Sequence, residues 1–133
     1  MIPADLTQRR REQPTILLAE DEPIVRLALA ETLRERGARV IECANADEAL
    51  EVVLTDTPVD VLVTDVRMPG TLDGIALARR VKHARPGLPI LVISADAPAD
   101  AAPSADAFLR KPVVEETVCT VVDRLVAASR SAR

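Results

Sequence analysis

The chain has 133 residues, of which 48% are hydrophobic and 29% charged, and its formal net charge is -4. This length suits one domain with a buried core, and the acidic balance argues against nucleic acid as a partner, because phosphate backbones are bound by clustered Lys and Arg. No run approaches the roughly 18 apolar residues of a membrane span, and the N-terminus lacks the apolar segment of a signal peptide. We therefore expect a cytoplasmic protein with no membrane partner.

The cysteine and histidine content argues against a zinc site. Cys43 and Cys119 lie far apart in the sequence, and the only histidine is His83, whereas zinc sites need clusters of these residues. We expect both cysteines to be reduced thiols that pack as small apolar side chains.

The chain alternates short apolar runs with longer segments of helical periodicity. Pro23 suits the first turn of a helix because its missing N–H would have no partner there, and Gly37 predicts the end of that helix. Asn45, with Glu48 three residues later, predicts a capping box at the start of the next helix. We expect strands at residues 15–19, 38–43, 60–64, 89–93 and 107–109, and helices at residues 23–36, 45–55, 72–84 and 113–128.

This alternation predicts a parallel sheet that helices cover on both faces. Pro98 and Pro103 interrupt any helix between the fourth and fifth strands, so we expect that helix to be short, irregular or absent. The domain is placed at residues 14–128, with a flexible extension at residues 1–13 and a polar tail at residues 129–133.

Polar residues stand where the predicted strands end. The carboxyl ends of parallel strands meet at one edge of the sheet, and the residues expected there are Glu20, Asp21, Asp65, Ser94 and Lys111. Any one of these acids alone is more often a solvated or capping group, but three converging carboxylates repel one another unless a ligand binds. A Mg²⁺ ion resolves the conflict, since it accepts two carboxylates together with water and a phosphate oxygen.

Four short motifs in this order resemble the receiver domain of response regulators. They are L-A-E-D-E (residues 18–22), V-T-D-V-R-M-P-G (residues 63–70), I-S-A (residues 93–95) and F-L-R-K-P (residues 108–112). The resemblance implies a flavodoxin-like α/β fold, with a doubly wound sheet of five parallel strands in the order 2-1-3-4-5. It also implies Mg²⁺-dependent phosphorylation by a sensor histidine kinase or a histidine phosphotransfer protein, followed by a conformational switch that an unknown downstream protein reads.

The resemblance assigns roles by position in these motifs. Asp65 is the phosphoryl acceptor, Ser94 hydrogen-bonds one phosphoryl oxygen and Lys111 pairs with another. The expected Mg²⁺ ligands are Asp21, Asp65, the main-chain carbonyl of Arg67 and, directly or through water, Glu20, which stands where the family often has Asp.

The switch and the lifetime of the phosphoryl group are assigned in the same way. Ser94 and Phe108 hold the switch positions, and we expect the Phe108 ring to prefer an inward position even without phosphate, because it has no hydroxyl group to satisfy. Arg67 and Asp96 lie two residues after Asp65 and Ser94. We expect them to pair above the site and to slow the loss of phosphate to water.

Two other functions stay open at this point. Phosphatases of the haloacid dehalogenase type also use a strand-end Asp with Mg²⁺, but they need an acid two residues later for proton transfer, where this chain has Arg67. A receiver-like adaptor that acts without phosphorylation is the second, although every expected catalytic position is filled. We expect no enzymatic activity beyond the domain's own phosphorylation and dephosphorylation, and a chain that either acts alone or is part of a longer protein.

Overall fold

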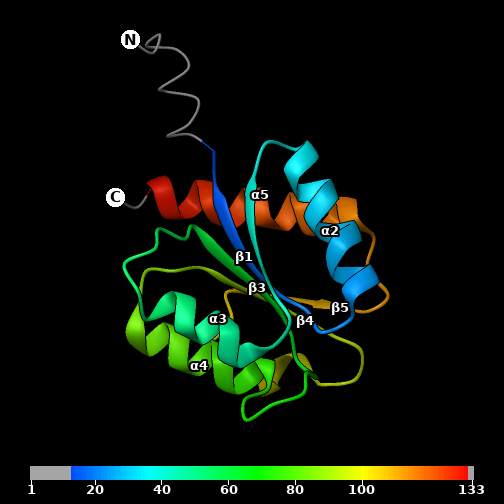
Figure 1. Cartoon of the computed structure of the whole chain (residues 1–133), viewed down its shortest axis with the longest axis vertical. Coiled ribbons are helices and arrows are strands. Elements are labelled where there is room, and N and C mark those ends of the chain that lie inside the picture. Colours follow the sequence, from blue (N-terminus) through cyan, green and yellow to red (C-terminus); the bar gives the residue numbers. More distant parts are fainter. Residues whose placement is uncertain (1–12, 132–133) are drawn as a thin grey trace, which may run out of the picture.

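One five-stranded parallel sheet organises the computed structural model, which describes residues 13–131 (Figure 1). The strand order is β2-β1-β3-β4-β5, which confirms the predicted flavodoxin-like arrangement. The strands are β1 (Thr15–Ala19), β2 (Arg39–Cys43), β3 (Val61–Asp65), β4 (Ile90–Ser94) and β5 (Ala107–Arg110). The helices are α2 (Pro23–Glu35), α3 (Ala46–Val53), α4 (Gly74–Ala84) and α5 (Glu115–Ser131). The flexible extension was predicted at residues 1–13, and all of these except Gln13 lie outside the described part of the chain.

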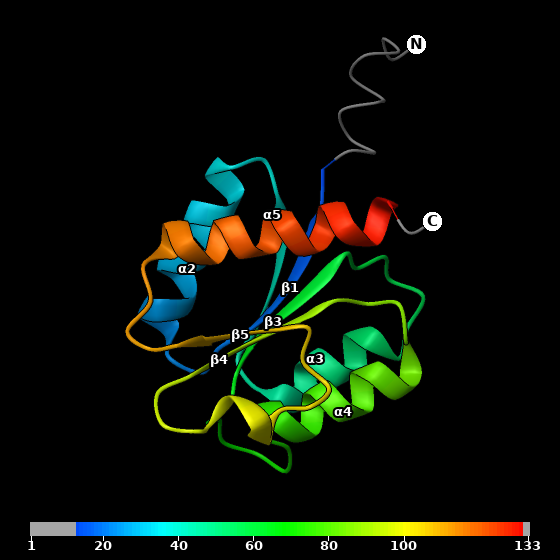
Figure 2. The same ribbon diagram turned by 180° about the vertical axis from the view of Figure 1, so that it is seen from behind.

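The helices cover both faces of the sheet, as Figures 1 and 2 show: α2 and α5 lie on one face, and α3 and α4 lie on the other. Each face buries its own apolar cluster. The α3/α4 cluster includes Leu17, Leu50, Leu62, Leu77 and Val92. The α2/α5 cluster includes Ile16, Leu33, Val63, Leu91 and Val118. Because successive strand residues point to opposite faces, the central strands are apolar on both sides, as a covered parallel sheet requires.

Local capping explains where several helices begin and end. Pro23 occupies the first turn of α2, and Gly37, which follows this helix, has a φ of +93°. The Asn45 side chain accepts a hydrogen bond from the Glu48 N–H at 2.8 Å, as the predicted capping box requires. Asp73 caps α4 in the same way, so this helix begins at Gly74, two residues later than predicted.

The connection between β4 and β5 contains only the short 3-10 turn Ala99–Ala101 (Figure 2), as the two prolines predict. Asp106 holds β5 in register without a helix there. Its N–H donates to the Ile90 carbonyl at 2.8 Å, and its carboxylate accepts from the Ile90 N–H and the Lys82 ammonium, both at 2.8 Å.

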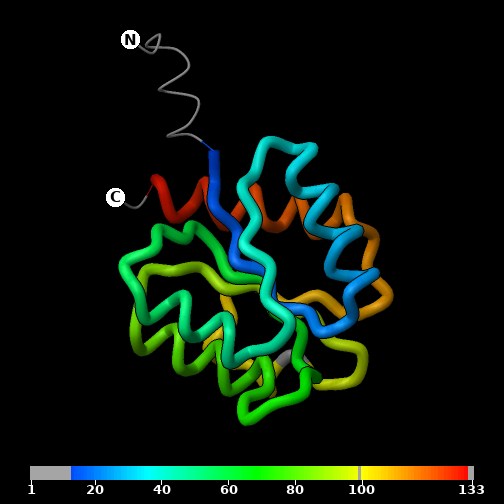
Figure 3. Tube along the Cα trace, in the orientation of Figure 1, coloured from blue at the N-terminus to red at the C-terminus, as the bar shows by residue number. Residues whose placement is uncertain are grey.

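Strand β1 begins and helix α5 ends at the same edge of the molecule (Figure 3). The Asp60 carboxylate links these segments, since it accepts a hydrogen bond from the Thr15 N–H at 2.7 Å and lies 4.0 Å from the Arg130 guanidinium. Helix α5 continues to Ser131, three residues past its predicted end, so residues 129–131 are helical. No described helix is long and apolar enough to cross a membrane.

Candidate functional site

The carboxyl ends of the strands bring three acidic side chains together. Glu20 and Asp21 directly follow β1, and Asp65 is the last residue of β3. Each offers a carboxylate oxygen, and these three oxygens lie within 4.8 Å of one another. The convergence that the sequence predicts is therefore present in the structure.

Lys111 completes the charged centre from the end of β5. Its ammonium nitrogen lies 2.7 Å from Asp65 Oδ2 and 3.7 Å from Glu20 Oε1. Burial alone would lower the pKa of Lys111, but the hydrogen bond and the negative charge of Asp65, together with Glu20, outweigh it and raise the pKa above its ordinary value. Lys111 is therefore a fixed cation, and the Lys111–Pro112 peptide that follows it is cis.

Glu20 is the most buried acid of the group. It is 4% exposed, and neither of its carboxylate oxygens has a hydrogen-bond partner among the described residues. Burial, followed by the neighbouring Asp65, raises the pKa of Glu20 from 4.5 to about 7. A buried carboxylate without donors is costly, and a cation with oxygen ligands would satisfy it. The three carboxylates thus fit Mg²⁺.

Ser94 lies at the end of β4, buried beside this centre. Its hydroxyl oxygen accepts a hydrogen bond from the Ala97 N–H at 2.9 Å, which leaves the hydroxyl proton free to donate. Its main-chain carbonyl accepts from the Lys111 N–H at 2.8 Å. Ser94 thereby couples the β4 loop to the strand that carries the lysine.

Phe108, the second residue of the expected switch, is partly buried and packs against the α3/α4 cluster. The Arg110 guanidinium lies 5.9 Å from the centre of its ring, within the range of a cation–π contact. The inward preference of this ring stays a prediction.

Arg67 and Asp96 form the expected ion pair, with 2.6 Å between Arg67 Nη2 and Asp96 Oδ2. The two side chains are 79% and 53% exposed, so the pair adds only about 0–1 kcal/mol to stability. A hollow of about 460 Å³ lies beside it, lined by Val66, Arg67, Met68, Asp73, Asp96 and Ala97. The role of the pair in phosphoryl lifetime stays a prediction.

Gly74 is a positioning residue that the sequence analysis missed. A Cβ atom at Gly74 would lie 1.9 Å from the Asp65 carbonyl oxygen and 2.9 Å from the Val66 Cα atom. The Gly74 N–H donates to the Val66 carbonyl at 2.8 Å. Helix α4 therefore packs directly on the main chain that carries Asp65. In the sequence, the only indication of this close packing is a glycine near the start of a predicted helix.

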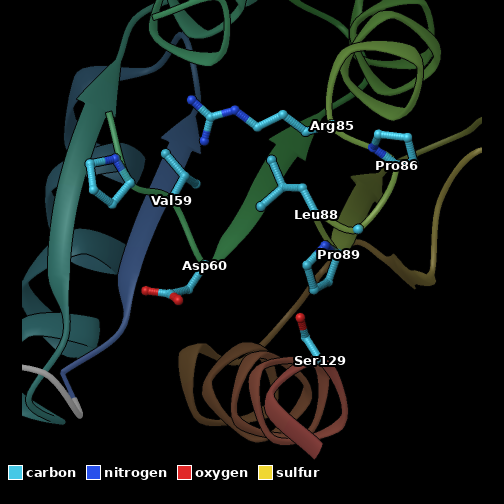
Figure 4. Close-up of a pocket in the computed structure, with 9 residues that line it drawn as sticks. Val59, Asp60, Arg85, Pro86, Leu88, Pro89 and Ser129 are labelled. Atoms are coloured by element: carbon cyan, nitrogen blue, oxygen red, sulfur yellow. The ribbon is translucent and has the colours of Figure 1, made fainter. Parts of the chain in front are cut away.

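A larger cavity of about 550 Å³ lies at the opposite, amino-terminal ends of the strands (Figure 4). Its two charged residues, Asp60 and Arg85, are both engaged in structural contacts. Asp60 accepts from the Thr15 N–H, and Arg85 donates to the carbonyls of Val53 and Thr55 at 3.1 and 2.7 Å. Both charged groups of this cavity are therefore held in structural contacts.

Comparison with known proteins identifies relatives of the same kind. The sequence profile of the response regulator receiver domain matches residues 16–123. The DNA-binding transcriptional regulator NtrC of Klebsiella pneumoniae is 33% identical over 114 residues, which are 82% of this chain and 24% of that protein. The sensor kinase CckA of Brucella abortus is 37% identical over 121 residues, or 84% of this chain and 12% of that protein. The chain thus spans a quarter or less of the length of these relatives.

Solved structures agree with this comparison. A response regulator receiver protein from Sinorhizobium medicae superposes with a TM-score of 0.83 at 32% identity, covering 90% of this chain and 98% of that one. The response regulator TrrA of Thermotoga maritima, solved with Mg²⁺ and BeF, gives a TM-score of 0.78 at 26% identity over 85% of this chain and 99% of that one. Because the profile runs from the first strand into the last helix, and acids and a lysine meet at the strand ends between, this chain belongs to the response regulator receiver domain family.

Proposed function

We propose that this receiver domain accepts a phosphoryl group on Asp65 from the phosphohistidine of a histidine kinase or phosphotransfer protein in the cytoplasm. The observation that carries the proposal is the position of Asp65, between the Lys111 ammonium at 2.7 Å and the carboxylates of Glu20 and Asp21. Of the three carboxylates, that of Asp65 lies nearer to the Lys111 ammonium, at 2.7 Å against 3.7 Å for Glu20.

The two oxygens of Asp65 are held in different ways. Oδ1 accepts a hydrogen bond from the Val66 N–H at 2.8 Å, and Oδ2 contacts Lys111. In the transfer, one oxygen forms a bond to phosphorus as the bond between phosphorus and the donor imidazole nitrogen breaks. Phosphoryl transfer depends mainly on positioning and charge stabilisation, which the fixed carboxylate and the lysine provide.

Other residues stabilise the incoming group. Lys111 would shift its ion pair to a phosphoryl oxygen, and the free proton of the Ser94 hydroxyl would donate to another. Mg²⁺, held by Asp21, Asp65, the Arg67 carbonyl and Glu20, would supply charge neutralisation between carboxylates and phosphate. The switch then proceeds through Ser94 and Phe108, and the domain catalyses only its own phosphorylation and dephosphorylation.

An apolar groove between α2 and α5 is the surface that we assign to the phosphodonor protein. The groove has a volume of about 300 Å³ and is lined by Ile24, Val25, Ala28, Leu29, Val113, Glu115 and Val118. Three of these residues, Val25, Leu29 and Val113, also line the small cavity that contains Glu20, Asp65 and Lys111. Ile24 is 84% exposed at its edge, and exposed apolar surface of this kind marks protein contacts.

The acceptor assignment is tested with acetyl phosphate and Mg²⁺. Wild type should incorporate base-labile phosphate, Asp65→Asn should incorporate none, and Asp73→Asn is the matched control, because this acid lies nearby and an asparagine still caps α4. Incorporation of equally labile phosphate by Asp65→Asn would refute the assignment. A wild-type protein that responds neither to acetyl phosphate nor to beryllofluoride would support the adaptor function instead.

A further inference from the structure

The turn that carries Glu20 and Asp21 is held by an arginine outside the site described so far. Arg26, in the first turns of α2, donates from Nη1 to the Glu20 main-chain carbonyl at 2.9 Å. On the other side of the same residue, the Glu20 N–H donates to the Cys43 carbonyl at 3.1 Å. Both peptide groups of Glu20 are therefore fixed.

Arg26 is itself held in place from strand β2. Its Nε atom lies 3.5 Å from Glu42 Oε1, while Glu42 Oε2 lies 3.0 Å from Arg34 Nη2 in a second ion pair. The Arg26 and Glu42 side chains are both partly buried, which limits the freedom of the guanidinium. The planar group thus donates a hydrogen bond to a carbonyl and forms an ion pair with a carboxylate.

These contacts act on the cation site through the main chain. The carbonyl that Arg26 binds belongs to the peptide group that joins Glu20 to Asp21, so its orientation sets the direction in which the Asp21 side chain leaves the turn. Glu20 must meanwhile keep a carboxylate that has no hydrogen-bond partner buried near Asp65, and a free turn would rotate it toward water.

We propose that Arg26 is a positioning residue of the cation site, because it fixes the peptide group between Glu20 and Asp21. Glu42 in turn holds Arg26. The inference rests on the proposed assignment of Glu20, Asp21 and Asp65 as Mg²⁺ ligands, and groups that orient metal ligands typically change metal affinity by about 10- to 100-fold when they are removed.

The test compares Arg26→Ala with Arg34→Ala. Both variants remove one cation from α2 and one partner of Glu42, but only Arg26 contacts the acidic turn, since Arg34 donates to the Val40 carbonyl instead. Mg²⁺ affinity is measured by calorimetry, because the chain has no Trp or Tyr to report binding by fluorescence. We expect Arg26→Ala to weaken Mg²⁺ binding about 10-fold or more and Arg34→Ala to leave it close to wild type.

Two further measurements separate positioning from a loss of folding. In the metal-free protein, the NMR amide resonance of Asp21 should shift in Arg26→Ala and not in Arg34→Ala. At saturating Mg²⁺, Arg26→Ala should be phosphorylated at most of the wild-type rate, because the variant loses Mg²⁺ affinity but keeps the acceptor.

A second variant, Glu42→Gln, keeps the side-chain shape. It should also weaken Mg²⁺ binding, to a smaller extent than Arg26→Ala, and it provides the measurement if Arg26→Ala does not fold.

Equal Mg²⁺ affinities in Arg26→Ala, Arg34→Ala and wild type, or an equal loss in both variants, would overturn the inference. A wild-type protein that does not bind Mg²⁺ would instead refute the cation site itself. The two failures are therefore distinguishable from the wild-type titration alone.

Discussion

Replacing Glu20 by Gln should stabilise the metal-free protein at neutral and alkaline pH, although Glu20 is an expected Mg²⁺ ligand. The folded protein raises the pKa of this carboxyl from 4.5 to about 7, first through burial and then through Asp65. At about 1.4 kcal/mol per pKa unit, this shift corresponds to at most roughly 3 kcal/mol of unfolding free energy. Since the folded state keeps the proton to a higher pH than the unfolded chain, this stability is present below pH 4.5 and is lost as the pH rises to about 7.

The assay is urea unfolding followed by far-UV circular dichroism, in the presence of a chelator, at about pH 4 and about pH 8. Glu20→Gln should match wild type at the lower pH and exceed it by roughly 2–3 kcal/mol at the higher pH. Mg²⁺ should narrow the gap, because a bound cation stabilises only the folded wild type. Glu31→Gln, on the exposed surface of α2, controls for the change in net charge. A difference between Glu20→Gln and wild type that does not change with pH would refute the reasoning.

Three further predictions concern Gly74, the Arg67–Asp96 ion pair and the groove between α2 and α5. Gly74→Ala should destabilise the fold by about 3 kcal/mol in urea unfolding, because its Cβ would overlap the Asp65 carbonyl oxygen; an unchanged midpoint would show that α4 can move away. We expect a phosphoryl lifetime of minutes or longer, which Arg67→Ala and Asp96→Ala should each shorten several-fold if their ion pair keeps water from the site; half-lives identical to wild type would exclude this role. Ile24→Asp should slow phosphorylation by a histidine kinase while leaving phosphorylation by acetyl phosphate unchanged; equal slowing with both donors would place its effect on the site rather than on docking.

The parts of the fold that short-range patterns control were predictable from the sequence. Strands β1, β3 and β4 are apolar runs that end at or directly before a polar residue, and the carboxyl-end rule for parallel sheets is enough to bring Glu20, Asp21 and Asp65 together. The prolines between β4 and β5 likewise predict the loss of a helix there, because a ring without an N–H interrupts the hydrogen-bond ladder. Asp73 shows the limit of such signals, since the helix was expected to begin one residue before this cap.

The supporting contacts were not predictable, because they join residues whose distance depends on tertiary packing. Nothing in the local sequence of Arg26 indicates that it contacts the Glu20 carbonyl and a carboxylate on β2. Asp106 similarly accepts hydrogen bonds from the Ile90 N–H and the Lys82 ammonium, 16 and 24 residues away in the chain. A glycine at a helix start such as Gly74 has several common explanations, and only the packing of α4 against β3 identifies the relevant one.

The sheet separates two apolar clusters that have no buried residue in common. A substitution that changes side-chain volume beneath α3 and α4 is therefore accommodated within that layer. Sequence changes in one layer do not require compensating substitutions in the other. Strand residues differ, because neighbours along a strand belong to opposite layers, as Leu62 and Val63 do. Over evolutionary time the sequences of the helices on the two faces can diverge independently. The strands, including β3 with Asp65 at its end, must remain compatible with the packing of both layers.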